Sequence, residues 1–241
     1  MTSSTRLAAA LSALAAVALI AGCTSTPGSS APTSSASPDS TASTGPSDDM
    51  EGALLDDGRM FAVVTSGSST CIPQVESATA EGQTISVTLT DGDDAGTVCT
   101  ADYAPRASVG AVPEGVDPTK EITLKVTYGD VSDTVDLDGD PAFTGVPGTS
   151  TEYTPSAGWV DDGTLVLLTW GSSSCPPAVV SLDGSGATGT VSFLTDESKV
   201  CTMDMAPRAT LLAFGDDKVA DDGFMLTLVG GGLDGTVAVR G

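Results

Sequence analysis

The chain of 241 residues carries 32 acidic against nine basic side chains, for a formal net charge of −23, and it contains no histidine. So acidic a surface repels nucleic acids and anionic lipid headgroups, which excludes nucleic acid as a partner. The lack of histidine excludes Ser-His-Asp catalysis and imidazole metal ligands. We therefore expect neither a cofactor nor a metal site, and no catalytic residue is assigned.

The chain begins with a short apolar segment, residues 7–21, which follows Arg6. As a helix this segment would span about 22 Å, less than the ~30 Å of a bilayer's hydrocarbon core. Such a length is typical of the apolar region of a signal peptide. We expect residues 1–22 to be a signal peptide that is removed.

The run Ile20-Ala21-Gly22-Cys23 resembles the lipobox of bacterial lipoproteins. The resemblance implies cleavage before Cys23, attachment of diacylglycerol and palmitate-type acyl chains there, and anchorage on the extracytoplasmic face of the cell membrane. The alternative is an ordinary signal peptide with a chance cysteine. The high Ala, Gly, Val, Asp and Thr content, with few lysines, resembles that of proteins from high-GC actinobacteria.

Residues 24–47 contain only Ser, Thr, Pro, Ala and Gly apart from Asp39. A segment without apolar side chains cannot offset the entropy lost on ordering. We expect residues 23–50 to form a disordered linker between the lipid anchor and the folded part.

The folded part contains an internal duplication, visible as three blocks in the same order. The first copies of the blocks are residues 54–58, 67–73 and 98–107, and the second copies are residues 159–163, 171–177 and 200–209. The duplication divides the chain into module 1 (54–140), a linker (141–157) and module 2 (158–241).

Both modules read as short strands separated by turns. Residues 84–90 and 121–127 alternate polar and apolar side chains with the period of a half-buried strand. Residues 60–64 and 164–169 are apolar and β-branched. Seven Asp-Gly pairs, which suit hairpin turns, separate such segments. We predict an all-β protein of two tandem antiparallel β-sandwiches or small barrels, each stapled by a disulfide.

Four cysteines follow Cys23, an even number that indicates disulfides in an exported chain. Four cysteines allow three pairings. The duplication favours Cys71 with Cys99 and Cys175 with Cys201, because each copy must have been closed before it was duplicated. Each bond is worth about 3–4 kcal/mol to a domain of this size.

The repeated block Asp-x-Ala-Pro-Arg is the candidate binding site, with Asp102 and Arg106 in module 1 and Asp204 and Arg208 in module 2. An Asp and an Arg four residues apart on a strand lie roughly 13 Å apart, so we do not expect them to pair. Each arginine either forms a structural pair with a carboxylate or anchors a ligand carboxylate or peptide terminus. We favour the structural pair.

Three further features have a structural explanation and a functional one. The repeated Gly-Ser-Ser-x-Cys loop could form an anion-binding nest, but a turn capped by its own hydroxyls is favoured. The aspartates at 136, 138 and 140, and those at 91–94, lack the spacing of a calcium loop and indicate a solvated acidic surface. Trp159 and Trp170 are expected in the core.

Taken as a whole, the sequence favours a cell-envelope lipoprotein with a binding or structural role. Its partners would be the membrane, through the lipid anchor, and an unknown envelope protein or peptide. The alternative is an accessory enzyme, or an enzyme inhibitor, of the cell envelope. Paired carboxylates would permit a hydrolase, but aromatic residues, which sugar sites use, are only 4% of the chain.

Overall fold

The computed structural model describes residues 49–92, 98–215 and 218–241, which belong to one compact unit. The expected signal peptide, Cys23 and the linker as far as residue 48 lie outside the described residues. Within the described ranges there are fourteen strands, one short 3-10 turn and no α-helix. No helix in that part of the chain is long and apolar enough to cross a membrane.

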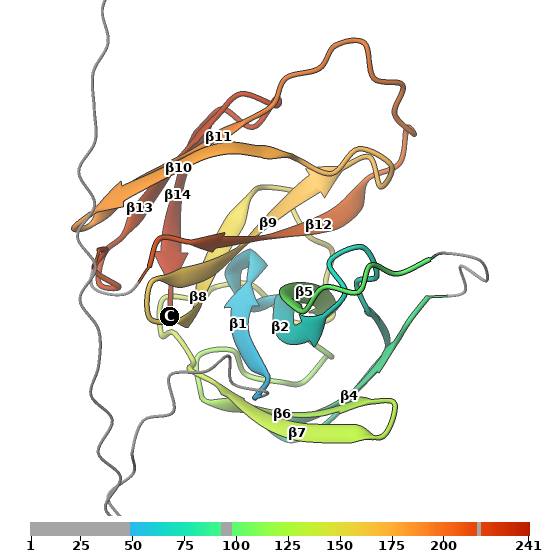
Figure 1. Cartoon of the computed structure of the whole chain (residues 1–241). Coiled ribbons are helices and arrows are strands. Elements are labelled where there is room, and N and C mark those ends of the chain that lie inside the picture. Colours follow the sequence, from blue (N-terminus) through green and yellow to red (C-terminus); the bar gives the residue numbers. More distant parts are fainter. Residues whose placement is uncertain (1–48, 93–97, 216–217) are drawn as a thin grey trace, which may run out of the picture. The chain divides into compact units, whose positions relative to one another are not determined.

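Module 1 contains seven strands in two sheets (Figure 1). The strands are β1 (Glu51–Leu55), β2 (Met60–Gly67), β3 (Gln74–Glu81), β4 (Thr84–Thr90), β5 (Ala104–Ala111), β6 (Ile122–Tyr128) and β7 (Val131–Leu137). One sheet has the order β1-β2-β5 and the other β3-β4-β6-β7. The first strand thus begins at Glu51, three residues before the boundary expected from the repeat.

Module 2 repeats this arrangement strand for strand. Its strands are β8 (Ser156–Asp161), β9 (Thr164–Gly171), β10 (Val179–Ser185), β11 (Thr188–Phe193), β12 (Ala206–Ala213), β13 (Met225–Val229) and β14 (Gly235–Arg240). The orders β8-β9-β12 and β10-β11-β13-β14 match those of module 1, and a short parallel pairing of β14 with β8 joins them into one seven-stranded sheet. Pairing is mostly antiparallel, but β4 pairs with β6 in parallel in module 1, and the equivalent β11 pairs with β13 in parallel in module 2.

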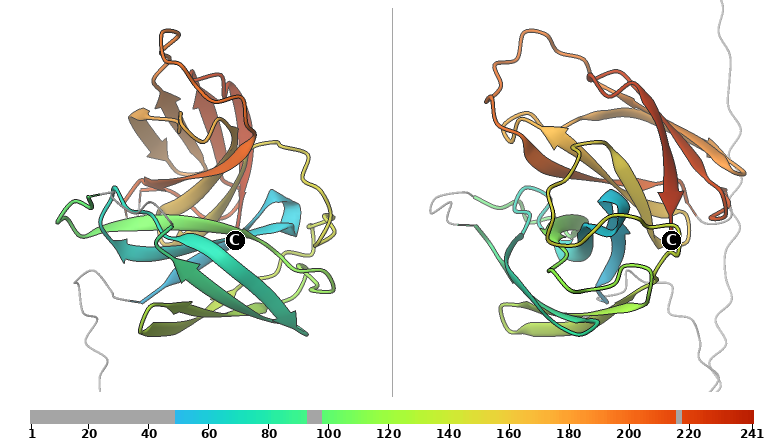
Figure 2. Two further views of the ribbon diagram at one scale, coloured as in Figure 1. Left: turned by 90° about the vertical axis from the view of Figure 1, so that its right-hand side faces the viewer. Right: turned by 180° about the vertical axis from the view of Figure 1, so that it is seen from behind.

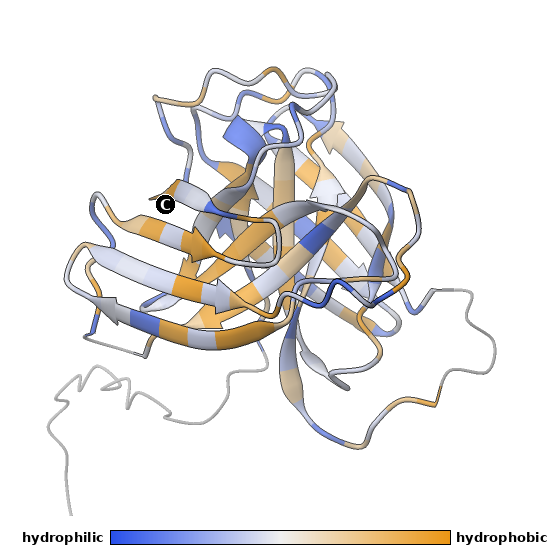
Figure 3. Ribbon diagram, turned by 90° about the horizontal axis from the view of Figure 1, so that it is seen from above, coloured by the Kyte–Doolittle hydropathy of each residue, from blue (hydrophilic) through white to orange (hydrophobic). Residues whose placement is uncertain are grey.

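Each module has its own apolar core, enclosed by its three-stranded and its four-stranded set. In module 1 the alternating residues Ile85, Val87 and Leu89 of β4 turn inward, as the sequence pattern predicts. They pack with Phe61 and Val63 of β2. Module 2 builds the equivalent core around Phe224 and its neighbours on β9, β11 and β13. In Figure 3 apolar residues gather on the strands, with a few on the projecting loops.

A third core joins the two modules. The three-stranded sheet of module 1 faces β8, β9 and β12 of module 2, as both views in Figure 2 show. Ala62 of β2 and Val166 and Leu168 of β9 lie in this shared core, although their sequence neighbours point into the cores of the separate modules. Strands buried on both faces have no polar face, which explains the continuous apolar runs at 60–64 and 165–168.

Close approach and polar contacts complete the junction between the modules. A Cβ added to Gly158 on β8 would lie 2.7 Å from the main-chain oxygen of Leu54 on β1. The Asp56 N–H donates to Ser156 Oγ at 2.8 Å. Arg240 at the end of β14 forms an ion pair with Asp140 at 3.0 Å. The two modules therefore pack as one body rather than as separate domains on a linker.

Candidate functional site

Both expected disulfides are present, and each closes a loop at one end of its module. Cys71 is bonded to Cys99 and Cys175 to Cys201, with Cα–Cα distances of 5.5 and 5.7 Å. The sequence prediction of pairing within each copy is confirmed.

The repeated arginine lies directly beneath this disulfide loop. Arg106 on β5 is only 5% exposed, and its guanidinium donates to the main-chain oxygens of Cys71, Ser68 and Ser66. The bond to the oxygen of Ser66 is 3.4 Å long. The arginine therefore holds the loop onto the sheet through its carbonyl groups.

Arg208 on β12 makes the equivalent contacts in module 2. It donates to the Cys175 oxygen at 3.0 Å and to the Trp170 oxygen at 2.8 Å. The expectation that each arginine pairs with a carboxylate is wrong, since the acceptors are main-chain carbonyls. A carbonyl is a suitable acceptor because it satisfies a buried N–H without a second buried charge.

The glycine that opens each repeated loop makes room for the guanidinium. A Cβ on Gly67 would lie 2.6 Å from Nη2 of Arg106, and one on Gly171 would lie 2.8 Å from Nη2 of Arg208. Distances this short leave no space for a side chain. The sequence shows these glycines in both copies, but only the structure shows what they accommodate.

The repeated aspartate caps the same loop from the segment that leads into β5 in module 1 and into β12 in module 2. Both carboxylate oxygens of Asp102 accept from the Ser69 N–H at 3.3 Å, and Asp204 accepts from the Ser173 N–H at 3.2 Å. The hydroxyls of Thr100 and Thr202 also donate to these carboxylates. These hydrogen bonds, first from the threonine and then from the serine, lower the pKa of Asp102 and of Asp204 to about 2. The loop hydroxyls take part as well, as the favoured explanation expected: Thr70 Oγ1 accepts from the Thr100 N–H at 3.1 Å and Ser174 Oγ from the Thr202 N–H at 3.0 Å.

The two modules differ in what covers the arginine. In module 1 the Tyr128 ring centre lies 5.8 Å from Cζ of Arg106, and the Tyr128 hydroxyl donates to Asp91. In β4 and β6, Leu89 pairs with Tyr128. The register of β11 with β13, continued one residue past its last pair Ser192–Val229, brings Gly230 to the position of Tyr128, and Gly230 indeed lies beside the Phe193 oxygen. Gly230 has no ring to place over Arg208.

A groove opens in module 2 where Tyr128 and Asp91 close the site in module 1. It has a volume of about 510 Å³ and is lined by Arg208, by both cysteines of the disulfide and by the segment from Leu194 to Lys199, with Gly231 at one side. The hollow at the corresponding place in module 1 measures about 180 Å³, and Arg106 does not line it. Among the described residues, the replacement of Tyr128 and Asp91 by Gly230 and Thr195 accompanies the change from a covered arginine to an open groove.

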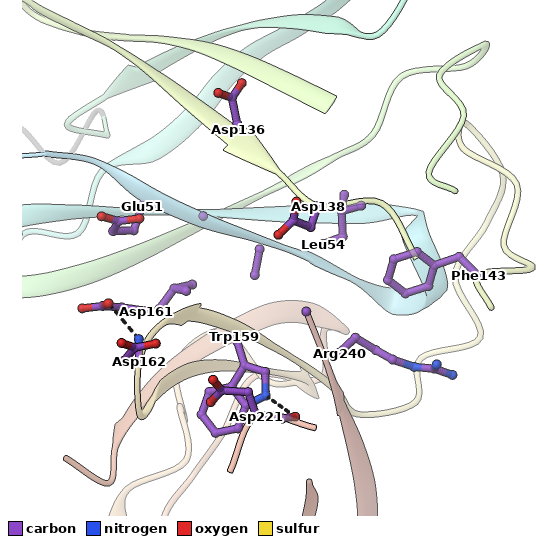
Figure 4. A pocket seen from close by; sticks show the side chains of 14 residues that line it. Glu51, Leu54, Asp136, Asp138, Phe143, Trp159, Asp161, Asp162, Asp221 and Arg240 are labelled. Carbon is purple, nitrogen blue, oxygen red and sulfur yellow. Dashed lines mark hydrogen bonds between the residues drawn. The ribbon is translucent and has the colours of Figure 1, made fainter. Parts of the chain in front are cut away.

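A second hollow, of about 400 Å³, lies between the modules and is acidic (Figure 4). Its carboxylates come from both modules: Glu51, Asp136, Asp138, Asp161, Asp162 and Asp221. Burial, and then the charges of Asp161 and other neighbours, raise the pKa of Glu51. Among the described residues that line it, Arg240 is the one basic side chain.

The acidic residues singled out in the sequence are distributed among structural contacts. Asp136 accepts from the Thr123 hydroxyl at 3.0 Å, and Asp140 pairs with Arg240. Across residues 49–92, 98–215 and 218–241 no three acidic or cysteine side chains are grouped as metal ligands. Residues 93–97, with two of the aspartates of the first acidic turn, lie outside the described residues.

The two tryptophans are half-buried at the edges of the cores rather than inside them. Trp159 packs against the core of module 2 and donates to the Asp221 oxygen at 3.2 Å. Trp170 borders the core between the modules, with the Tyr153 ring centre 5.2 Å away in an edge-on contact.

The fold and this site define a two-module, disulfide-stapled all-β protein. Comparison with known proteins adds no relative: no protein family, no curated protein and no solved structure matches the chain.

Proposed function

We propose that this chain is a bacterial cell-envelope lipoprotein, anchored through Cys23 on the extracytoplasmic face of the membrane, whose module 2 binds a protein or peptide of the envelope. Module 1 then has a structural role, since it packs against module 2 along β1, β2 and β5. The observation that carries the proposal is the duplicated arginine, closed off by Tyr128 in module 1 and open to a groove in module 2.

Two features support the assignment to the envelope: the disulfides and the N-terminal segment. Two disulfides persist only where the surroundings are oxidising, as they are outside the cytoplasmic membrane. The apolar segment 7–21 and the run that ends at Cys23 supply a route of export and an anchor.

Metabolic labelling with an alkyne fatty acid tests the anchor. We expect the full chain to take up the label and fractionate with membranes, and the Cys23→Ala variant to take up none. Label on the Cys23→Ala variant would exclude Cys23 as the anchoring residue.

Site-specific photo-crosslinking in intact cells tests the binding groove. Leu194 lines the groove and is 58% exposed, and the register makes Thr90 its counterpart in module 1. We expect a photoreactive residue at position 194 to give a discrete protein adduct that position 90 does not give. Adducts of the same size from both positions, or from neither, would contradict a binding role specific to module 2.

The acidic cleft favours a second candidate function, an accessory enzyme of the envelope. Acid–base hydrolysis uses a pair of carboxyl groups, one of them with a raised pKa, and in this cleft Glu51, whose pKa is raised by burial and then by Asp161, lies with Asp161 on the lining. Hydrolysis of envelope polysaccharide by the wild-type chain, abolished in both Glu51→Gln and Asp161→Asn, would establish this candidate. No turnover by the wild type would leave binding as the function.

A further inference from the structure

Module 1 contains an aromatic ring over its arginine, and the module 2 groove has no such ring among its described lining residues. Tyr128 places an aromatic ring over Arg106 and directs its hydroxyl to Asp91. We propose that the module 2 groove takes an aromatic side chain, in the first place tyrosine, from a protein partner, seated over Arg208 as Tyr128 is seated over Arg106. This inference rests on the proposed function and names the chemistry of the group that is bound.

The guanidinium of Arg208 is suited to such a ring. Two of its nitrogens are held by the carbonyls of Cys175 and Trp170, and its buried Nε has no hydrogen-bond partner among the described residues. Partial burial, which lowers the pKa of Arg208, also removes water that would compete for the cation. A desolvated arginine attracts the face of an aromatic ring more strongly than an exposed one does.

Module 2 has no side chain at the position that Tyr128 occupies in module 1, because the equivalent residue is Gly230. Gly230 has a φ of +78°, and a Cβ there would lie 2.8 Å from the main-chain oxygen of Phe193. Gly231 follows with a φ of +62°, and its N–H donates to Thr195 Oγ1 at 2.9 Å. The backbone conformation of this turn admits only glycine without strain, so the turn leaves the groove open.

The size and polarity of the groove agree with this occupant. Its volume of about 510 Å³ lies within the usual range for ligand sites. Pro176, Pro177 and Leu194 supply apolar walls, and Thr195, the counterpart of Asp91, supplies a hydroxyl where the phenol of Tyr128 finds a carboxylate in module 1. A tyrosine in this groove therefore meets apolar surface, a cation and a hydroxyl, beside the charged side chains of Asp196, Glu197 and Lys199.

Arginine-selective NMR tests the proposal on the full chain in detergent micelles, with N-acetyl-tyrosinamide as the probe. We expect the Arg208 Nε–H resonance to shift upfield on titration and to saturate with a dissociation constant on the order of 1 mM. The Arg106 resonance should not move, because Tyr128 already covers it. The cyclohexylalanine analogue, which lacks a π face, should bind about three-fold more weakly or worse.

Two variants extend the test to both modules. Thr195→Asp restores the carboxylate that Tyr128 uses, and should raise the preference for tyrosinamide over phenylalaninamide several-fold. Tyr128→Ala should make the Arg106 resonance respond to the probe as well. If this variant loses its native spectrum, the comparison of Arg208 with Arg106 in the wild type decides alone.

The outcomes separate this inference from the proposed function. No saturable shift at Arg208, or equal binding of the cyclohexyl analogue, overturns the aromatic occupant. An adduct from position 194 without aromatic binding would leave the binding function standing and remove only this inference. Aromatic binding without any adduct would uphold the groove chemistry and remove the envelope partner.

Discussion

The guanidinium of Arg106 donates a hydrogen bond to the main-chain oxygen of Cys71, so that a buried cation and a disulfide hold the same loop. Arg208 and Cys175 repeat this relationship in module 2. The arginine and the disulfide constrain one segment by different means, one through hydrogen bonds in the folded state and the other by restricting the unfolded chain.

Replacement of either repeated arginine by lysine should destabilise the protein, because one ammonium cannot reproduce a planar donor to several carbonyls. We expect a loss of about 2–4 kcal/mol for Arg106→Lys and less for Arg208→Lys, which is less buried. Urea unfolding of residues 48–241 measures this, with the half-exposed Arg240→Lys as a control near zero. Urea unfolding curves that coincide with the wild type would show that these arginines are not structural.

Removal of one disulfide should cost about 3–4 kcal/mol in the chain-entropy account of a loop of this length. The variant with Cys71→Ala and Cys99→Ala should therefore unfold at lower urea, and reduction of the wild type, which breaks both disulfides, should lower the midpoint further. Peptide mapping without reduction supplies the control on connectivity. A Cys71–Cys175 link in that map would contradict the structure.

Acid should weaken the loop caps between about pH 4 and pH 2. The pKa of Asp102 and of Asp204 is lowered from 3.8 to about 2 in the fold by the hydroxyl and N–H donors around them. A folded-state pKa below the unfolded value means that the stabilisation is complete above pH 4 and is lost as the pH falls towards 2. Melting temperature against pH should fall less steeply in this window for Asp102→Asn with Asp204→Asn. Asp117→Asn serves as the comparison for an aspartate outside the two disulfide loops, because the pKa of Asp117 is also lowered to about 2, chiefly by the hydrogen bond from Lys120.

A side chain at Gly158 should disrupt the contact between the modules. A Cβ there meets the Leu54 oxygen at 2.7 Å and the Ala53 Cβ at 2.9 Å, so we expect Gly158→Ala to cost about 1–3 kcal/mol. Gly235→Ala is the matched control, because a Cβ at Gly235 has no neighbour within 4 Å. Equal melting temperatures for the two variants would mean that β8 and β1 are not packed closely in solution.

The local features of the fold could be predicted from the sequence because they depend on residues close in the chain or on the repeat. Alternation along 84–90 indicates a half-buried strand, and the duplicated Cys–Cys spacing indicates the pairing. The parallel pairing of β4 with β6 could not be predicted, because strand order depends on contacts between segments that sequence periodicity does not connect.

The candidate site was predicted only in its residues and not in its contacts. Arg106 and Arg208 stand out because they are repeated. Their acceptors are main-chain carbonyls, which every residue has, so the sequence does not identify them. Tyr128 could have drawn attention only through its absence from module 2, where the register puts Gly230.

By itself the sequence determined the all-β class, the two copies and the two disulfides, because hydrophobic period, turn residues and duplicated cysteines are written along the chain. Only the tertiary structure decided that the modules share a core and that one copy closes over its arginine while the other leaves a groove. The physical reason is that burial on the second face of β2 and β9, and the ring of Tyr128 over Arg106, arise from segments brought together by folding. Their energies depend on three-dimensional neighbours that neither composition nor spacing identifies.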